Sequence, residues 1–402
     1  MSERIAITGL GIISAIGDNV HQNLASLRAK RSGIGQIKYL ETIHKGILPI
    51  AEVKHSDDEL LILLGVSENT GYTRTALLGM IAAKEAFADS GAKKGDGIRT
   101  AMISATTVGG MGSTEKFYLD YINPEKTGDF VKYIDSHDCG DSAEKIADNL
   151  GIKDFITSIN TACSSSANAL MLGARLIKHG IVDRVVAGGV DGLTKFTING
   201  FNTLMILDKE YCKPFDKNRT GLTLGEGSGF VVLESLEVAQ KAGKKIYCEL
   251  SGYANTCDAY HQTASSPEGT GAFLSMSSAL ALSGLEIEDI DYVNVHGTAT
   301  QINDLSEGNA MIKFFGNKVP KFSSTKGYTG HTLAAAGGIE AVFSALTIYN
   351  NTIFPNLNFK DKMDEFDLIP VTDLIENAGV KNVLSNSFGF GGNNTSLIFS
   401  KV

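Results

Sequence analysis

Several features are absent from the sequence, and each absence argues against a class of protein. The cysteines contain no C-x-x-C pair and are odd in number, which argues against a disulfide framework and a zinc site; they are Cys139, Cys163, Cys212, Cys248 and Cys257. No run reaches the roughly 18 uncharged apolar residues that a membrane-spanning helix needs. Positive charge is not in excess, because the formal net charge is −9, so neither nucleic acid nor an anionic membrane is expected as the main partner.

The chain also begins without a signal-peptide pattern, because its first residues lead directly into the strand-like Ile5-Ala6-Ile7. We therefore expect a cytoplasmic protein. The 402 residues have an ordinary globular composition, 43% hydrophobic and 20% charged, and are sufficient for two domains or one large duplicated domain. The 44 glycines cluster beside short apolar runs, which is typical of tight strand-to-helix turns in an α/β fold.

The predicted elements occur in the same order in the two halves of the chain. Strands are predicted at residues 4–7, 100–107, 184–189 and 230–233, and again at 246–250, 292–295 and 383–386. Helices are predicted at 72–88, 163–178 and 330–346, whereas residues 19–70 are predicted to be irregular. The repeat indicates two βαβ-type halves with buried strands and helices, residues 1–244 and 245–402. Residues 8–14 start like a dinucleotide fingerprint, but Ser14 occupies the third glycine position, so NAD binding is disfavoured.

Cys163 is the first candidate for a reactive residue. It lies in the stretch Asn160-Thr161-Ala162-Cys163-Ser164-Ser165-Ser166, and we predict that it falls in the first turn of a helix that continues to Lys178. A helix N-terminus carries a partial positive charge and unpaired N–H groups, both of which favour a thiolate. The alternative is a buried structural cysteine, which is the commoner role of a free cysteine.

Three further motifs place a polar reactive residue at the end of a predicted strand, among Gly, Thr and Ser. They are His296-Gly297-Thr298-Ala299-Thr300, the run from Ser324 to His331 that contains Lys326, and the run from Ser385 to Gly392 that contains Phe388 and Phe390. A lone histidine is more often a satisfied polar group than a catalyst. Two histidines in such settings, together with a cysteine at a helix start, favour a catalytic site in which Cys163 and His331 face each other across the joint between the halves.

Together these motifs resemble the β-ketoacyl-(acyl-carrier-protein) synthases of the elongating, Cys-His-His type, which belong to the thiolase-like superfamily. The resemblance extends essentially from end to end, and residues 214–227 match the Pro-Phe-Asp…Gly-Glu-Gly segment of the family. It implies a duplicated α/β fold of five αβαβα layers with two buried sheets. It also implies an acyltransferase that joins carbon atoms by decarboxylative condensation and needs no metal or redox cofactor.

The resemblance implies a catalytic role for each residue of the Cys-His-His set. Cys163 would take an acyl chain from a carrier thioester, and its backbone N–H would form an oxyanion hole with that of Phe390. His296 and His331 would hold the malonyl thioester oxygen through neutral Nε2–H donors while carbon dioxide leaves. Lys326 would support His331 and be neutralised by Glu340, unless the two form a purely structural ion pair.

Further residues match family positions that bind substrate or support the site. Phe390 resembles a gating phenylalanine whose neighbouring glycines let its loop move. The pantetheine arm would be bound by threonine hydroxyls and the acyl chain by a distal pocket; the matching positions are Thr298, Thr300, Val108, Asp258, Phe388 and Asn394. A structural monovalent cation is held in some members at positions that match Asn294, Glu307, Glu340, Ser385 and Asn386, although the same oxygens could bond to one another.

The expected partner is an acyl carrier protein, which would deliver the phosphopantetheine, and the expected assembly is a homodimer or a heterodimer with a homologous subunit. Housekeeping members carry a basic cluster for the carrier where this chain has residues 67–71, Ser-Glu-Asn-Thr-Gly, with Arg74 as the nearby cation. The docking charge must therefore come from elsewhere, or the carrier differs. Asn393 replaces the usual threonine, and the Ser164–Ser166 triplet is common in polyketide-type synthases, so both fatty-acid and polyketide or polyene elongation remain open.

Three alternative functions are weighed against condensation. A non-catalytic partner subunit, like a chain-length factor, usually lacks the reactive cysteine that this chain retains. A thiolase needs a second catalytic cysteine in the C-terminal half, and Cys248 and Cys257 lie in the wrong surroundings, ahead of His296. A priming synthase of the Cys-His-Asn type is disfavoured because His331 occupies the third catalytic place.

Overall fold

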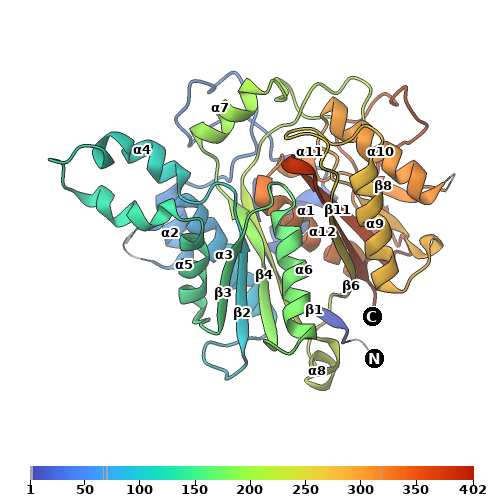
Figure 1. Cartoon of the computed structure of the whole chain (residues 1–402), viewed down its shortest axis with the longest axis horizontal. Coiled ribbons are helices and arrows are strands. Elements are labelled where there is room, and N and C mark those ends of the chain that lie inside the picture. The colour runs from blue at the N-terminus through green and yellow to red at the C-terminus, as the bar shows by residue number, and fades with distance from the viewer. Residues whose placement is uncertain (1–2, 67, 69–70, 317) are drawn as a thin grey trace.

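The computed structural model of the protein describes residues 3–66, 68, 71–316 and 318–402, and its strands form one ten-stranded sheet and a two-stranded ribbon (Figure 1). In spatial order the sheet consists of β3 (Phe155–Ile159), β2 (Thr100–Ala105), β4 (Arg184–Asp191), β5 (Gly227–Ser235), β1 (Ile5–Ser14), β6 (Cys248–Cys257), β12 (Asn393–Ser400), β11 (Asn382–Gly389), β7 (Tyr292–Asn294) and β8 (Lys321–Ser323). The ribbon pairs β9 (Thr352–Ile353) with β10 (Ile375–Glu376).

The large sheet consists of two five-stranded halves with the same strand arrangement. In the first half β2 is parallel to β3 and β4, and β5 is antiparallel to β4 and β1. In the second half β7 is parallel to β8 and β11, and β12 is antiparallel to β11 and β6. The halves are joined where Ala6 pairs with Glu249 and Ile7 with Cys248. The two sheets expected from the sequence are therefore joined along one short edge.

Helices separate and cover the two half-sheets. The helices are α1 (Val20–Arg28), α2 (Asp57–Leu64), α3 (Arg74–Asp89), α4 (Met111–Tyr121), α5 (Gly140–Leu150), α6 (Ser165–Lys178), α7 (Lys195–Thr203), α8 (Leu236–Lys241), α9 (Thr270–Ser283), α10 (Gln301–Phe315), α11 (Lys326–Thr329) and α12 (Ala336–Asn350), with 3-10 segments at Asp129–His137, Ile287–Asp289, Leu333–Ala335 and Phe390–Gly392. Helices α6 and α12 contact each other and strands of both half-sheets. Helices α3 and α5 cover the outer face of the first half, and α9 with α10 that of the second, which gives five layers (Figure 1).

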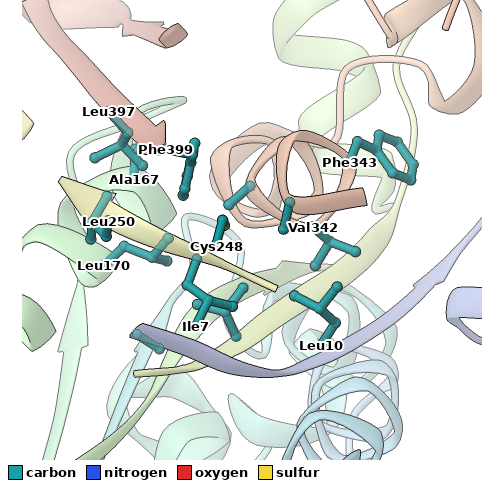
Figure 2. Packing of buried hydrophobic residues seen from close by; sticks show 14 of the residues in the cluster. Ile7, Leu10, Ala167, Leu170, Cys248, Leu250, Val342, Phe343, Leu397 and Phe399 are labelled. Carbon is teal, nitrogen blue, oxygen red and sulfur yellow. The ribbon is translucent and has the colours of Figure 1, made fainter. Parts of the chain in front are cut away.

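The central core lies where α6 and α12 meet β1, β6 and β12. Figure 2 shows the side chains from these five elements in one cluster: Ile7, Leu10, Ala167, Leu170, Cys248, Leu250, Val342, Phe343, Leu397 and Phe399. On the other side of β1, Gly11 lets α3 approach closely, since a Cβ there would lie 2.0 Å from the Ala82 carbonyl oxygen. β1 pairs with β5 as far as Ser14, so the N-terminal strand extends well beyond the predicted residues 4–7.

One expectation about local structure is corrected. Residues 19–70 were expected to be irregular, but they contain α1 and α2; Asn19 caps α1, and Ser56 with Glu59 forms a capping box at α2.

The stretch Leu333–Asn350 is long and apolar enough to cross a membrane by length and composition, although it contains the charged Glu340. Because 89% of this stretch is buried inside the fold, it is weak evidence for a membrane span.

Candidate active site

Cys163 lies in the turn between β3 and α6, at the carboxyl end of a partly exposed parallel strand at the edge of the sheet. The helix begins at Ser165 with Ser164 as its N-cap. Cys163 therefore precedes the helix, whereas the sequence had predicted it in the first turn. The preceding Ala162 has a φ of 53°, a left-handed conformation that turns the chain sharply toward the helix. Burial raises the pKa of the Cys163 thiol to about 12, against the opposing effect of the Lys326 charge. Burial is the largest of these effects, and it favours the neutral thiol over the thiolate.

The loop after β11 presses against the Cys163 turn. A Cβ at Gly389 would lie 2.8 Å from the Thr161 carbonyl oxygen and 3.0 Å from the Cys163 nitrogen, so only glycine allows this approach. The backbone N–H groups of Phe390 and of Cys163 itself both act to lower the pKa of the thiol. Two backbone donors thus lie beside the sulfur, next to where the oxyanion of an acyl group on that sulfur would form.

His296 and His331 lie side by side, with ring centroids 5.3 Å apart and planes at 85°. His296 follows β7, and His331 lies between α11 and the 3-10 turn that precedes α12, not at the start of the long helix as predicted. The Nδ1 of His331 accepts from the Leu333 N–H at 3.3 Å, and the Lys326 ammonium lies 3.4 Å from the Nδ1 of His296. This network assigns the proton of each neutral ring to Nε2. Burial, then the Lys326 charge, lowers the pKa of both histidines well below 6.5.

Lys326 and Glu340 form a buried ion pair behind the histidines. The Lys326 Nζ lies 2.5 Å from Glu340 Oε1 and donates to the His296 carbonyl oxygen, also at 2.5 Å. Each side chain is only 2% exposed. Burial raises the pKa of Glu340, and Lys326 opposes this effect. Lys326 was expected to support His331, but its ammonium contacts the Nδ1 and the carbonyl oxygen of His296, and it acts on His331 through its charge.

The side chains that matched a cation site are mostly hydrogen-bonded. Glu307 accepts from the backbone N–H groups of His296 and Gly297, at 2.9 and 2.8 Å, and from the Asn386 amide at 3.1 Å. Asn294 donates to Ser385 Oγ, while Glu340 pairs with Lys326 through Oε1 and its buried Oε2 has no hydrogen-bond partner among the described residues. No group of three or more acidic, histidine or cysteine ligands is found among the described residues. The carboxylates of Glu307 and Glu340 therefore hold the His296 backbone and the Lys326 ammonium.

Two cavities meet at Cys163. The first, of about 320 Å³, brings Cys163, His296 and His331 together with Thr298, Thr300 and Phe388. The hydroxyls of Thr298 and Thr300 lie 3.0 Å apart, and Thr300 also caps α10. The Phe388 ring centroid lies 5.8 Å from that of His296.

The second cavity, of about 390 Å³, is mainly apolar and is lined by Val108, Met111, Phe196, Leu204 and Leu333. Cys163, Phe201 and Phe390 line both cavities. The Phe390 ring stacks on Phe201 at 5.7 Å, so it lies at the boundary between the two spaces. Moving this one ring would change how freely the cavities connect.

Two of the residues matched to substrate positions brace the loop that carries Phe390. Asn394 donates to the Gly392 carbonyl oxygen at 2.7 Å. The same oxygen accepts from the Asp258 N–H at 3.1 Å, and the Asp258 carboxylate accepts from the Ser266 N–H. The structure thus connects Asp258 and Asn394 to the gate loop.

Buried carboxylates that the sequence did not single out also position the site. Asp191, at the end of β4, accepts from the Thr106 and Thr107 hydroxyls and from the N–H groups of Val108 and Ala334. It therefore ties the acyl-cavity wall to the segment after His331. The sequence feature that could have identified Asp191 is a polar residue at the end of an apolar strand, the same feature that identified the histidine motifs. Asp304 similarly accepts from the Ala299 and Phe215 N–H groups behind the Thr298 turn.

Arg74 is not a surface cation. Its guanidinium bonds Glu226 at 2.6 Å and Asp57 at 2.8 Å, and it also donates to the carbonyl oxygens of Val53 and His55. The positive charge of Arg74 is therefore paired with carboxylates of the chain itself. Residues 67, 69 and 70, part of the stretch compared with the family's basic cluster, lie outside the described residues.

Comparisons with known proteins agree with this geometry. Residues 2–239 match the β-ketoacyl synthase N-terminal domain and residues 247–360 the β-ketoacyl synthase C-terminal domain. The chain is 33% identical to a 3-oxoacyl-[acyl-carrier-protein] synthase 2 of Staphylococcus aureus, covering 100% of this chain and 99% of the relative. It is 34% identical to the protein of the same name from Coxiella burnetii, covering 99% of each.

Solved structures are similar over the whole chain. The ishigamide ketosynthase/chain length factor has a TM-score of 0.93 at 30% identity, with full coverage of both chains. A type II PKS acyl-carrier protein in complex with its ketosynthase has a TM-score of 0.89 at 26% identity, again with full coverage of both chains. The thiolase-like α/β fold predicted from the sequence is thereby confirmed.

Proposed function

The chain belongs to the β-ketoacyl synthase family, and from this premise we propose that it elongates acyl chains by decarboxylative Claisen condensation on a carrier protein. The observation that carries the proposal is the meeting of one thiol and two neutral imidazoles in a single cavity. The chain would act as a 3-oxoacyl-[acyl-carrier-protein] synthase, like its curated relatives.

In the first step Cys163 receives the acyl chain. The thioester bond to the phosphopantetheine sulfur breaks, a thioester to Cys163 forms, and the thiol proton of Cys163 goes to the departing pantetheine sulfur. Because burial favours the neutral thiol, we expect its proton to move in the course of the transfer. The N–H groups of Cys163 and Phe390 stabilise the oxyanion of the tetrahedral intermediate, and removing such a donor typically costs about 3 kcal/mol.

In the second step the histidines act on the malonyl thioester. The bond between the malonyl carbon and its carboxylate breaks, and the electron pair forms an enolate whose oxygen accepts from the Nε2–H groups of His296 and His331. The enolate carbon then attacks the acyl carbon, a carbon–carbon bond forms, and the Cys163 sulfur leaves and regains a proton. Neutral rings suit this role because both histidine pKa values are held well below 6.5.

Phe390 serves as the gate between the two cavities. The space that holds Thr298 and Thr300 would take the phosphopantetheine arm, and the apolar space beyond Phe390 would take the acyl chain. Gly391 and Gly392 have φ values of 80° and 82°, in the left-handed region. Glycine adopts this backbone conformation freely, whereas other residues adopt it only with strain. Asp258 and Asn394 would hold the loop in its closed position.

The assembly and pathway are inferred from the relatives. We propose an acyl carrier protein as partner, with phosphopantetheine arriving on it, and a dimer with an identical or homologous subunit in the cytoplasm. The two functional halves are residues 1–244, with the nucleophile, and 245–402, with both histidines. The substrate belongs to fatty-acid or polyketide-type elongation. A chain-length-factor role is disfavoured because Cys163 and both histidines are retained in one cavity.

The test uses the purified chain with an octanoyl-loaded and a malonyl-loaded acyl carrier protein. We expect release of carbon dioxide and formation of a 3-oxodecanoyl carrier. Cys163→Ala should abolish this product while leaving the fold unchanged. Continued elongation by Cys163→Ala would rule the mechanism out, and failure of the wild-type chain to decarboxylate malonyl carrier would favour a non-catalytic subunit.

A further inference from the structure

We propose that the carrier protein docks on an apolar rim made by Met205 and Ile302 at the mouth of the first cavity, and that this docking depends little on ionic attraction. The inference rests on the proposed function, because the phosphopantetheine arm must enter the cavity that leads to Cys163. Both rim residues line that cavity, so a carrier that covers its mouth must contact them. The partner would present an exposed apolar surface beside its pantetheine-bearing serine.

Met205 is an unusual residue for an exposed turn. Its side chain is 87% exposed, and its backbone has a φ of 56°, in the left-handed region. The Met205 N–H donates to the Asn202 carbonyl oxygen, so this is the left-handed position that commonly ends a helix, here α7. Single exposed apolar residues are common on protein surfaces, but this one also lines the cavity that leads to Cys163.

Ile302 also lines the cavity, in the first turn of α10, and its side chain is 50% exposed. The backbone beneath it is fixed. The buried Arg219 donates to the Gln301 carbonyl oxygen at 3.0 Å and to the Thr300 carbonyl oxygen at 3.4 Å. A rigid apolar residue loses little freedom when a partner covers it, which favours its use in an interface.

The mouth offers little positive charge to an acidic partner. Among the described residues that line the first cavity, none is charged. The segments that form its walls, residues 205–220, 257–268 and 297–304, contain four basic and six acidic side chains.

Most of those basic groups are already engaged. Lys213 pairs with Glu210 and Lys217 with Asp364, each at 2.8 Å, and Arg219 is buried under α10. Arg74 is likewise committed to Glu226 and Asp57. Contact energy at this mouth must therefore come mainly from apolar area, because long-range attraction needs a net charge of the opposite sign.

The test compares two acyl donors, an octanoyl-loaded bacterial acyl carrier protein and octanoyl-pantetheine, which has the arm but no protein. The measured quantity is the second-order rate of Cys163 acylation, read by intact mass. Met205→Glu should lower the carrier rate about tenfold more than the pantetheine rate, because it places a charge where apolar area should be covered. Met205→Gly fits the left-handed backbone and should have a smaller effect of the same sign.

A matched control lies at the far end of α6. Ile181 is 53% exposed and follows the last turn of that helix, about 20 Å from Cys163 by the rise of the helix. Ile181→Glu should change neither rate by more than about twofold. For the wild type, raising NaCl from about 0.05 to 0.5 M should change the carrier rate by less than about threefold, whereas ionic docking would lose tenfold or more.

The outcomes separate the two proposals. If Met205→Glu affects both donors equally, or if salt lowers the wild-type carrier rate tenfold, docking through the apolar rim is wrong while the acyl transfer stands. If the wild type accepts octanoyl from neither donor, the proposed function itself fails.

Discussion

The Lys326–Glu340 pair provides a prediction that separates a structural role from a positioning role. Lys326→Met removes the ammonium that bonds Glu340 at 2.5 Å and faces the Nδ1 of His296 at 3.4 Å. It leaves a carboxylate in a site that is 2% exposed, where its Oε2 already has no hydrogen-bond partner among the described residues. The single variant therefore disturbs both the fold and the histidine.

The magnitudes differ for the two effects. Breaking a buried pair by removing one partner costs about 3–5 kcal/mol of folding free energy. Replacing both partners with apolar residues of similar volume is often close to neutral, so Lys326→Met combined with Glu340→Met should return stability to within about 1–2 kcal/mol of the wild type. The Nδ1 of His296 still lacks its donor in the double variant. Some His296 rings then carry their proton on Nδ1 and cannot donate from Nε2. Complete loss of an oxyanion donor lowers the rate by up to about 10²–10³-fold.

The assay measures urea unfolding and the rate of malonyl-carrier decarboxylation per folded enzyme for the wild type, both single variants and the double variant. We expect the double variant to recover its stability while its decarboxylation rate stays at least about tenfold below that of the wild type. Recovery of both quantities together would show that the ion pair is purely structural and that our account of His296 is wrong.

Three further predictions concern His331, Phe390 and Gly389. Because the folded pKa of His331 is well below 6.5, only the unfolded chain binds this proton as the pH falls below 6.5, and the wild type loses stability. The free energy of unfolding of His331→Asn should therefore rise relative to that of the wild type by up to about 1.4 kcal/mol per pH unit below 6.5. The same difference between the two proteins at pH 7.5 and at pH 5.5 would contradict this. Phe390→Gly keeps the backbone donor but opens the boundary between the cavities, so acylation of Cys163 by octanoyl-pantetheine should be at least as fast as in the wild type; slower loading by a folded variant would exclude a gate. Gly389→Ala places a Cβ 2.8 Å from the Thr161 carbonyl oxygen and should slow acylation about tenfold or more, whereas Gly35→Ala, with no atom within 4 Å, should not.

Much of the fold could be predicted because its central strands are buried on both faces. Apolar runs such as residues 184–189 and 383–386 correspond to β4 and β11, and the repeated order of elements corresponds to the repeated strand arrangement of the half-sheets. Helix α2 was missed although Ser56 and Glu59 form the S-x-x-E pattern of a capping box, a signal present in the sequence. The joining of the two sheets through Ala6 and Ile7 could not be predicted, because it depends on tertiary pairing.

The candidate site was predictable in its residue types and less so in its electrostatics. Cys163, His296 and His331 stood out because each lies among small residues such as Gly, Thr and Ser, and the structure brings them to one cavity. The raised pKa of Cys163 could not be foreseen, because the predicted helix start is visible in the sequence and the burial of the thiol is not. Asp191 was missed for the same reason, since its partners are far away in the chain.

The most direct test of the account is peptide mapping of the wild-type protein by mass spectrometry after incubation with octanoyl-pantetheine. We predict one octanoyl group per chain, attached to the peptide that contains Cys163, and its disappearance when malonyl carrier is added as the 3-oxodecanoyl product forms. An octanoyl group on Cys139, Cys212, Cys248 or Cys257 in place of Cys163, or an adduct on Cys163 that malonyl carrier leaves untouched, would contradict the convergence of this thiol and the two histidines in one reaction.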